Sequence, residues 1–107
     1  MIKAFISQPM RDKSNEEILA ERAKAVESIK RNCNDDVEII ESFFQDMPEV
    51  KSKPLLCLGK SIELLANADV AYFCKDWEKY RGCRIENRCA IDYGIDVIED
   101  YRESEAD

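Results

Sequence analysis

Histidine is missing from this sequence of 107 residues, and its absence removes the usual general base and the commonest metal ligand of proteins. The cysteines number five, and their spacing matches neither a zinc-binding pattern nor a CxxC redox motif. We therefore expect them to be small apolar side chains in a reducing compartment, and we expect a site without metal or cofactor. Cys83 is the exception, because a place in the first turn of a helix would lower the pKa of its thiol.

Positive charge is also scarce. The chain has 16 Lys and Arg against 23 Asp and Glu, for a net charge of −7, and no basic stripe offsets this balance. We therefore expect no nucleic acid polymer among its partners. No apolar run approaches the roughly 20 residues of a membrane span, and the N-terminus lacks a signal-peptide pattern. A cytoplasmic protein that does not bind a membrane is the expectation.

Glycine-rich phosphate loops are absent as well, since the sequence contains neither GxGxxG nor a Walker pattern. Gly59-Lys60-Ser61 is similar to the end of a P-loop, but the upstream glycine is missing and the segment falls within an expected helix. A phosphate would instead be held by the backbone amides that follow the first strand, with Arg11 or Lys13.

What the chain does contain is an alternation of short apolar runs and amphipathic segments, which favours a parallel sheet covered by helices on both faces. With right-handed crossovers this predicts a flavodoxin-like three-layer α/β sandwich with strand order 2-1-3-4 in a single domain, residues 1–107. The expected strands are Ile2–Ser7, Val37–Ile40, Asp69–Cys74 and a short one at Val97–Ile98, and the expected helices run from about 15 to 32, 54 to 67 and 82 to 94.

Local signals mark the helix ends. Ser14 with Glu17 forms a capping box, Pro54 suits a first helical position, and Gly94 suits a helix C-terminus. The spacing also predicts an apolar stripe on the first helix and a well-buried second helix. The stripe comprises Ile18, Leu19, Ala23, Val26, Ile29 and Cys33.

Two regions are less regular. Residues 41–53 are expected to be a loop that includes Phe43 and Phe44 and covers one side of the site. The acidic tail, residues 99–107, is expected to fray.

The loops Gln8–Lys13 and Lys75–Arg81 follow the first and third strands, so they meet at the switch point where open α/β sheets bind ligands. Asp69, at the opposite end of the third strand, is expected to be structural.

Three segments carry a resemblance. FISQPMRDKSNEEI, KPLLCLGKSIELLANADVAYF and the pattern W-x4-GCRIE-x3-A-x3-G resemble a family of small bacterial and phage proteins of unknown function, similar to nucleoside 2-deoxyribosyltransferases. The resemblance covers residues 2 to about 98. It implies a doubly wound sheet, a catalytic Glu86 that follows Gly82, and a homo-oligomer whose sites borrow residues from a neighbour. Arg81, Arg88 and Gln8 depart from the enzymes, which commonly have smaller residues there.

These residues support an enzyme and a binding module alike. In the first hypothesis, the chain is a nucleoside or nucleotide N-glycosidase or 2-deoxyribosyltransferase-like enzyme with Glu86 as nucleophile at C1′. In the second, the same pocket binds a nucleotide of the ADP-ribose type without turnover, favoured by the positive charge of Arg81 and Arg88. A third option is a structural oligomer with a vestigial cleft.

The other candidate site residues have their own alternatives. Asp76 would contact the sugar or the base, or be a turn-forming aspartate; Trp77 would stack on the base, or pack on its own loop. Glu86 itself could be an ordinary exposed helical glutamate. The full set of candidate substrate-binding residues is Ser7, Gln8, Met10, Asp76, Trp77 and Gly82.

Overall fold

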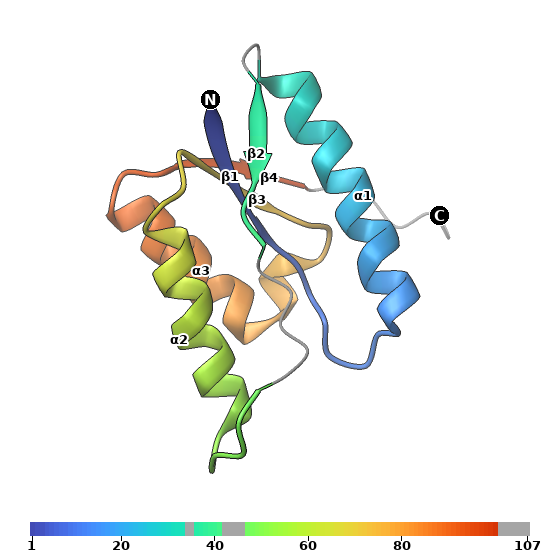
Figure 1. Ribbon diagram of the computed structural model, residues 1–107, viewed down its shortest axis with the longest axis vertical. Helices are drawn as coiled ribbons and strands as arrows, with labels where there is room; N and C mark the ends of the chain where they lie inside the picture. Colours follow the sequence, from blue (N-terminus) through green and yellow to red (C-terminus); the bar gives the residue numbers. More distant parts are fainter. Residues whose placement is uncertain (34–35, 42–46, 101–107) are drawn as a thin grey trace.

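The fold is a parallel α/β sandwich, seen in a computed structural model that describes residues 1–33, 36–41 and 47–100. Over these residues the sheet has four parallel strands in the order β2-β1-β3-β4, as the alternation predicted. Figure 1 shows the elements, which are β1 (Ile2–Ser7), α1 (Asn15–Asn32), β2 (Val37–Ile39), α2 (Lys53–Leu65), β3 (Val70–Phe73), the 3-10 turn η1 (Trp77–Lys79), α3 (Arg81–Asp92) and β4 (Asp96–Glu99).

The helix ends follow the local sequence signals. Ser14 accepts a hydrogen bond from the amide of Glu17, whose carboxylate accepts one from the Ser14 amide, so the capping box is confirmed. Pro54 lies in the first turn of α2. Gly94 has a positive φ of 76° just after α3, the conformation that a terminal glycine provides at little cost.

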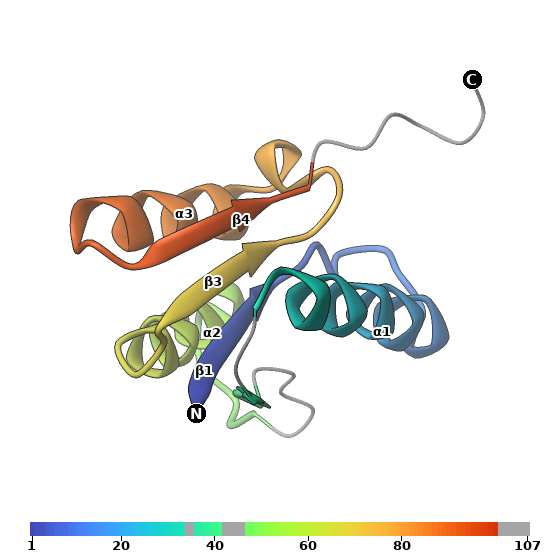
Figure 2. The ribbon, with the colours of Figure 1, turned by 90° about the horizontal axis from the view of Figure 1, so that it is seen from above.

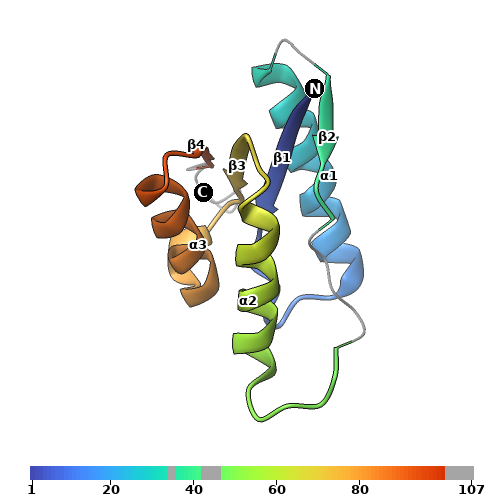
Figure 3. The same cartoon turned by 60° about the vertical axis from the view of Figure 1, so that its left-hand side comes forward.

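Each face of the sheet has its own core, because successive strand residues point to opposite faces. Figures 2 and 3 show α1 on one face and α2 with α3 on the other. Ala4 and Ile6 of β1 pack toward α1, whereas Phe5 belongs to the cluster under α2 and α3. The α1 core is Ala4, Ile6, Ala25, Ile29, Val70, Tyr72 and Cys74; the other core is Phe5, Leu65, Ala71, Phe73, Trp77, Cys83 and Ala90.

The stripe expected on α1 is partly wrong. Ile18 and Ile29 are buried, but Leu19 is 56% exposed and Ala23 is also exposed, while Arg22 and Ala25 are buried instead. The helix is turned so that Arg22 faces the sheet, where its guanidinium reaches backbone and carboxylate oxygens that the apolar pattern does not reveal.

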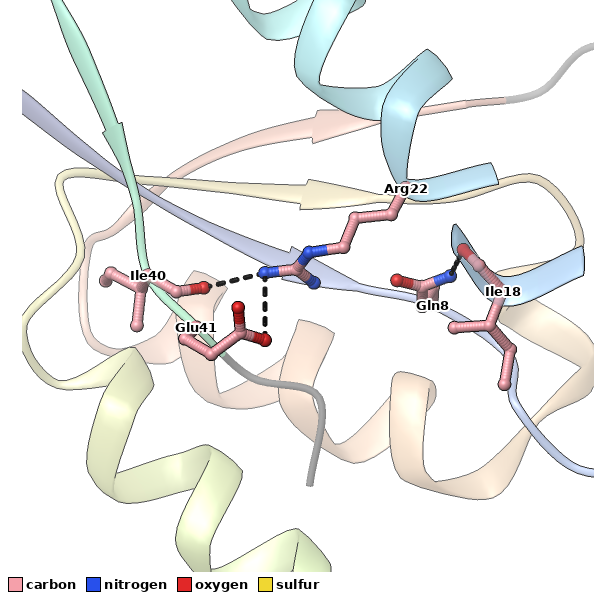
Figure 4. Close-up of polar contacts among 5 residues, drawn as sticks. All are labelled: Gln8, Ile18, Arg22, Ile40 and Glu41. Carbon is pink, nitrogen blue, oxygen red and sulfur yellow. Dashed lines mark hydrogen bonds and ion pairs between the residues drawn. The ribbon is translucent and has the colours of Figure 1, made fainter. Parts of the chain in front are cut away.

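These contacts form a polar corner between α1 and β2 (Figure 4). Arg22 Nη2 donates to the Ile40 carbonyl at 2.9 Å and lies 3.9 Å from a carboxylate oxygen of Glu41. Because its charge is paired and hydrogen-bonded, Arg22 can be buried, with 9% of its surface exposed.

The prediction of a well-buried α2 is wrong. Leu65 is the buried residue of this helix, and Leu55 near its start is 67% exposed. Figure 3 shows α2 extending past the ends of the strands, and its packing is chiefly against α3. The strands are therefore too short to cover its N-terminal half.

Two further expectations concern loops and the tail. Phe43, Phe44 and residues 101–107 lie outside the described part of the chain. Glu99 belongs to β4, and Asp100 is buried with its amide donating to the Phe73 carbonyl at 2.9 Å, so the start of the predicted tail is ordered.

Asp69 is structural, as expected. Its carboxylate accepts a hydrogen bond of 2.8 Å from the Lys3 amide at the start of β1. This end of the sheet is opposite the site.

Candidate functional site

A cavity of about 270 Å³ opens at the C-terminal end of β1, between α2 and α3. Its walls come from the end of β1 and its following loop, from one side of α2, and from the first turns of α3. We call it the Glu86 cavity; it is lined by Phe5, Ile6, Ser7, Gln8, Pro9, Met10, Arg11, Pro54, Cys57, Leu58, Ser61, Tyr80, Gly82, Cys83 and Glu86.

Ser7 and Glu86 meet in this cavity although 79 residues separate them in the chain. Ser7 lies two residues after Phe5 and so faces α3. Glu86 lies on the buried stripe of α3, between Cys83 and Ala90. The Ser7 hydroxyl donates to a carboxylate oxygen of Glu86 at 2.5 Å, and the two residues are 2% and 8% exposed. The alternative of an exposed helical glutamate is therefore wrong.

Burial raises the pKa of the Glu86 carboxyl above its usual range, because removal from water penalises the charged form. The hydroxyls of Ser7 and Ser61 act in the opposite direction on this pKa, since they donate to the ionised form. Among the described residues, the Glu86 side chain is thus held by hydroxyls, and none of the ion pairs between these residues includes it. Groups with shifted pKa values that face a cavity are typical of functional sites.

Cys83 also lines the cavity, but it is not an activated thiol. Burial raises its pKa to about 11, and the hydrogen bond with Ser7 only partly opposes this. The expectation of a lowered pKa is wrong here, because burial and the nearby Glu86 carboxyl raise the pKa of this thiol more than Ser7 and Arg84 lower it. The thiol remains neutral at physiological pH.

The loop after β1 provides the opposite wall. Gln8 is 6% exposed, and its Nε2 donates to the Ile18 carbonyl at 2.9 Å, which ties the loop to α1 (Figure 4). Its buried amide oxygen has no hydrogen-bond partner among the described residues. Met10 lines the cavity beside it. Ser7, Gln8, Met10, Gly82 and Glu86 are therefore the predicted site residues that the fold brings together.

Asp76 and Trp77 lie elsewhere. Asp76 is in the left-handed region at φ 69°, forms an ion pair of 3.3 Å with Lys79, and lines a separate hollow beside α1. Trp77 is 8% exposed and packs on Phe73, with ring centroids 5.5 Å apart. Both side chains are outside the Glu86 cavity, so the geometry supports the turn-forming and loop-packing alternatives for them.

A second hollow adjoins the Glu86 cavity at the start of α3. We call it the basic hollow, and Arg11, Tyr80 and Gly82 line both spaces. The guanidinium of Arg11 lies 5.7 Å from the centre of the Tyr80 ring. Arg88, by contrast, lines neither space and pairs with Asp92 at 2.9 Å. The basic hollow is lined by Arg11, Lys79, Tyr80, Arg81, Gly82 and Arg84.

Some lining residues were not anticipated from the sequence. Cys57 and Ser61 lie four residues apart on α2, one helical turn, and so share the face that looks into the cavity. Two small side chains one turn apart, among the larger apolar side chains of this helix, were the sequence signal for this wall. Tyr80 had no comparable signal, since its place depends on how η1 ends against α3.

The wider comparisons add no relative. No protein-family model, no curated protein and no solved structure matches this chain. Within the described ranges, no group of three His, Cys, Asp or Glu side chains is placed to hold a metal ion, and none of the helices has the length and apolarity needed to cross a bilayer. The Glu86 cavity is therefore the feature of this chain that bears most directly on its function.

Proposed function

We propose that this chain is a nucleoside or nucleotide N-glycosidase, or a 2-deoxyribosyltransferase-like enzyme, with Glu86 as the nucleophile. The observation that carries the proposal is the buried Glu86 carboxylate, which accepts a hydrogen bond from Ser7 and faces a cavity at the switch point of the sheet. A carboxylate in such a place can attack or stabilise the oxocarbenium-like C1′ of a sugar.

The chemistry would run in two displacements. A Glu86 oxygen bonds to C1′ while the C1′–N bond breaks, and the electron pair leaves with the base, which takes a proton from water. A water molecule, or the nitrogen of a second base, then bonds to C1′, releases the carboxylate and gives up its own proton. Ser7 would act as a positioning residue, because its hydroxyl donates to Glu86 and fixes the direction of the carboxylate, together with the hydroxyl of Ser61.

The cavity suits a substrate with an apolar ring and a polar sugar. Phe5, Leu58 and Pro54 supply apolar walls, while Ser7 and Ser61 bring hydroxyls to the carboxylate. The proposal assigns the base-contacting role to these walls and leaves Asp76 and Trp77 out of the site.

The test follows free base by chromatography for a panel of nucleosides and their 5′-phosphates. Glu86→Gln keeps the size and hydrogen-bonding oxygen of the side chain, so we expect the fold to remain while base release falls on the order of a thousandfold or more. Glu38→Gln, an exposed position of β2 that lines neither the Glu86 cavity nor the hollow on α2, is the matched control and should retain the full rate. Unchanged base release by Glu86→Gln would refute the assignment.

A second candidate is a nucleotide-binding module without turnover. The observation in its favour is the basic hollow beside the Glu86 cavity, in a chain whose net charge is −7. A rise of the melting temperature with nucleotides, but no base release from any of them, would support this candidate over the enzyme.

We also propose a cytoplasmic homo-oligomer. The exposed Leu55 and Val50 line a shallow apolar hollow on α2, the helix that also walls the Glu86 cavity. A second copy of the chain packed against this hollow would cover the exposed side chains of Leu55 and Val50. Light scattering on the purified chain measures the oligomeric state, and a monomer at all concentrations would contradict this proposal.

A further inference from the structure

The charge of this chain is unevenly distributed around the site. Although the net charge is −7, four cationic side chains line one hollow, the basic hollow at the start of α3. Arg11 comes from the loop after β1, Lys79 from η1, and Arg81 and Arg84 from the first turn of α3. Segments distant in the sequence thus place like charges together, which costs free energy unless an anion offsets it.

Three of these four cationic side chains have no carboxylate partner in the part of the chain that the structure describes. Within the described residues, Arg11, Arg81 and Arg84 form no ion pair; Lys79 pairs with Asp76, and Arg84 donates to the Glu78 carbonyl at 3.1 Å. An arginine fork matches the oxygens of a phosphate and can bind two of them at once. Among the described residues, the positive charge of these arginines is therefore not neutralised by a carboxylate and is available to bind an external anion.

The backbone at the start of α3 also favours the binding of an anion. The first turn of α3 contains no acidic residue, and the Tyr80 side chain makes no capping hydrogen bond. The positive end of the helix dipole therefore faces the hollow together with the arginines. A Cβ built on Gly82 would meet no atom within 4 Å apart from its chain neighbours and the backbone of its own helix, so there is open room at the first turn of α3.

The position of the hollow decides what kind of anion fits. Arg11, Tyr80 and Gly82 line both the basic hollow and the Glu86 cavity, so one molecule can occupy both spaces. A nucleoside 5′-monophosphate has this form: its phosphate is joined through one carbon to the sugar whose C1′ must approach Glu86. The cations would also offset the repulsion between the phosphate and the Glu86 carboxylate.

We propose that the basic hollow binds the 5′-phosphate of the substrate, so that the chain acts on nucleoside 5′-monophosphates in preference to nucleosides. This inference rests on the proposed function for catalysis, but phosphate binding can be measured without it. Arg11 and Arg81 are the principal ligands, since both are exposed at the hollow and neither is paired with a carboxylate among the described residues.

The experiment compares kcat/KM for base release from each 2′-deoxynucleoside and its 5′-monophosphate. We expect the monophosphate to be preferred by roughly 10- to 100-fold, as one or two charge-assisted contacts provide. In Arg81→Gln the preference should fall about tenfold, chiefly through KM, and it should weaken in wild type as salt is raised. Arg88→Gln is the matched control on the same helix and should keep the preference, because Arg88 lies outside both spaces.

Thermal shift with the nucleoside, its monophosphate and inorganic phosphate provides the second measurement. A shift that is specific to the monophosphate and lost in Arg81→Gln, without base release, would support the phosphate site and refute the enzyme. Base release at equal kcat/KM from both substrates would refute the phosphate site and leave the enzyme standing. An equal shift with inorganic phosphate alone would overturn the nucleotide assignment in favour of a free-phosphate site.

Discussion

Two buried charged side chains occupy opposite faces of the sheet, and their surroundings differ. Arg22, 9% exposed, donates to the Ile40 carbonyl and lies near the Glu41 carboxylate in the polar corner between α1 and β2 (Figure 4). Glu86, 8% exposed, accepts from the Ser7 hydroxyl and faces a cavity. A buried charge whose partners are protein groups of opposite sign serves the fold, whereas one held only by hydroxyls beside an open space is available for chemistry.

The largest expected effect is on the pH dependence of base release. In the proposed reaction the nucleophile Glu86 must be ionised, and burial raises its pKa, so the rate of base release should fall about tenfold per pH unit below that raised pKa. Removing the Ser7 hydroxyl takes away a donor to the ionised form, so Ser7→Ala should move the profile to higher pH. Initial rates of base release across a pH series measure both. A midpoint unchanged by Ser7→Ala would show that Ser7 does not hold the reacting carboxylate.

The next largest effect is a loss of stability when the polar corner between α1 and β2 loses Arg22. Arg22→Ala leaves the Ile40 carbonyl without its donor, so we expect a loss of about 2 kcal/mol in the free energy of unfolding and a fall in Tm on the order of 10 °C. Urea unfolding measures the change. Glu41→Gln is the control: its side chain is 77% exposed and 3.9 Å from Arg22, so it should cost under about 0.5 kcal/mol. Equal losses would mean that the ion pair, and not the carbonyl contact, stabilises this corner.

The smallest expected effect is a gain in stability, on replacement of Glu86. Because the folded chain raises the pKa of Glu86, the unfolded chain releases this proton at lower pH, and ionisation costs stability as pH rises through the folded pKa. Glu86→Gln should therefore stabilise the protein at neutral pH by about 1 kcal/mol, or a few degrees in Tm. The gain should vanish below the pKa of an unfolded glutamate. A destabilised Glu86→Gln at neutral pH would show that the ionised carboxylate supports the fold, as Arg22 does.

Sequence and structure agree most closely where local signals act. The capping box at Ser14, Pro54 and Gly94 mark helix ends through contacts within a few residues. The alternation of apolar runs also predicted the strand order, since right-handed crossovers leave few arrangements. Along β1 the same alternation places Ser7 on the face of Phe5, opposite Ile6.

The tertiary structure alone decided what these elements enclose. Whether Glu86 is buried, and whether Trp77 and Asp76 reach the site, depends on how α2 and α3 pack beyond short strands. The sequence by itself determined the helices and strands, their order and the residues at the end of the first strand, because neighbouring residues specify these features. It could not determine the Ser7–Glu86 contact or the gathering of Arg11 with Arg81, because such pairs form only when distant segments are brought together by the burial of both cores.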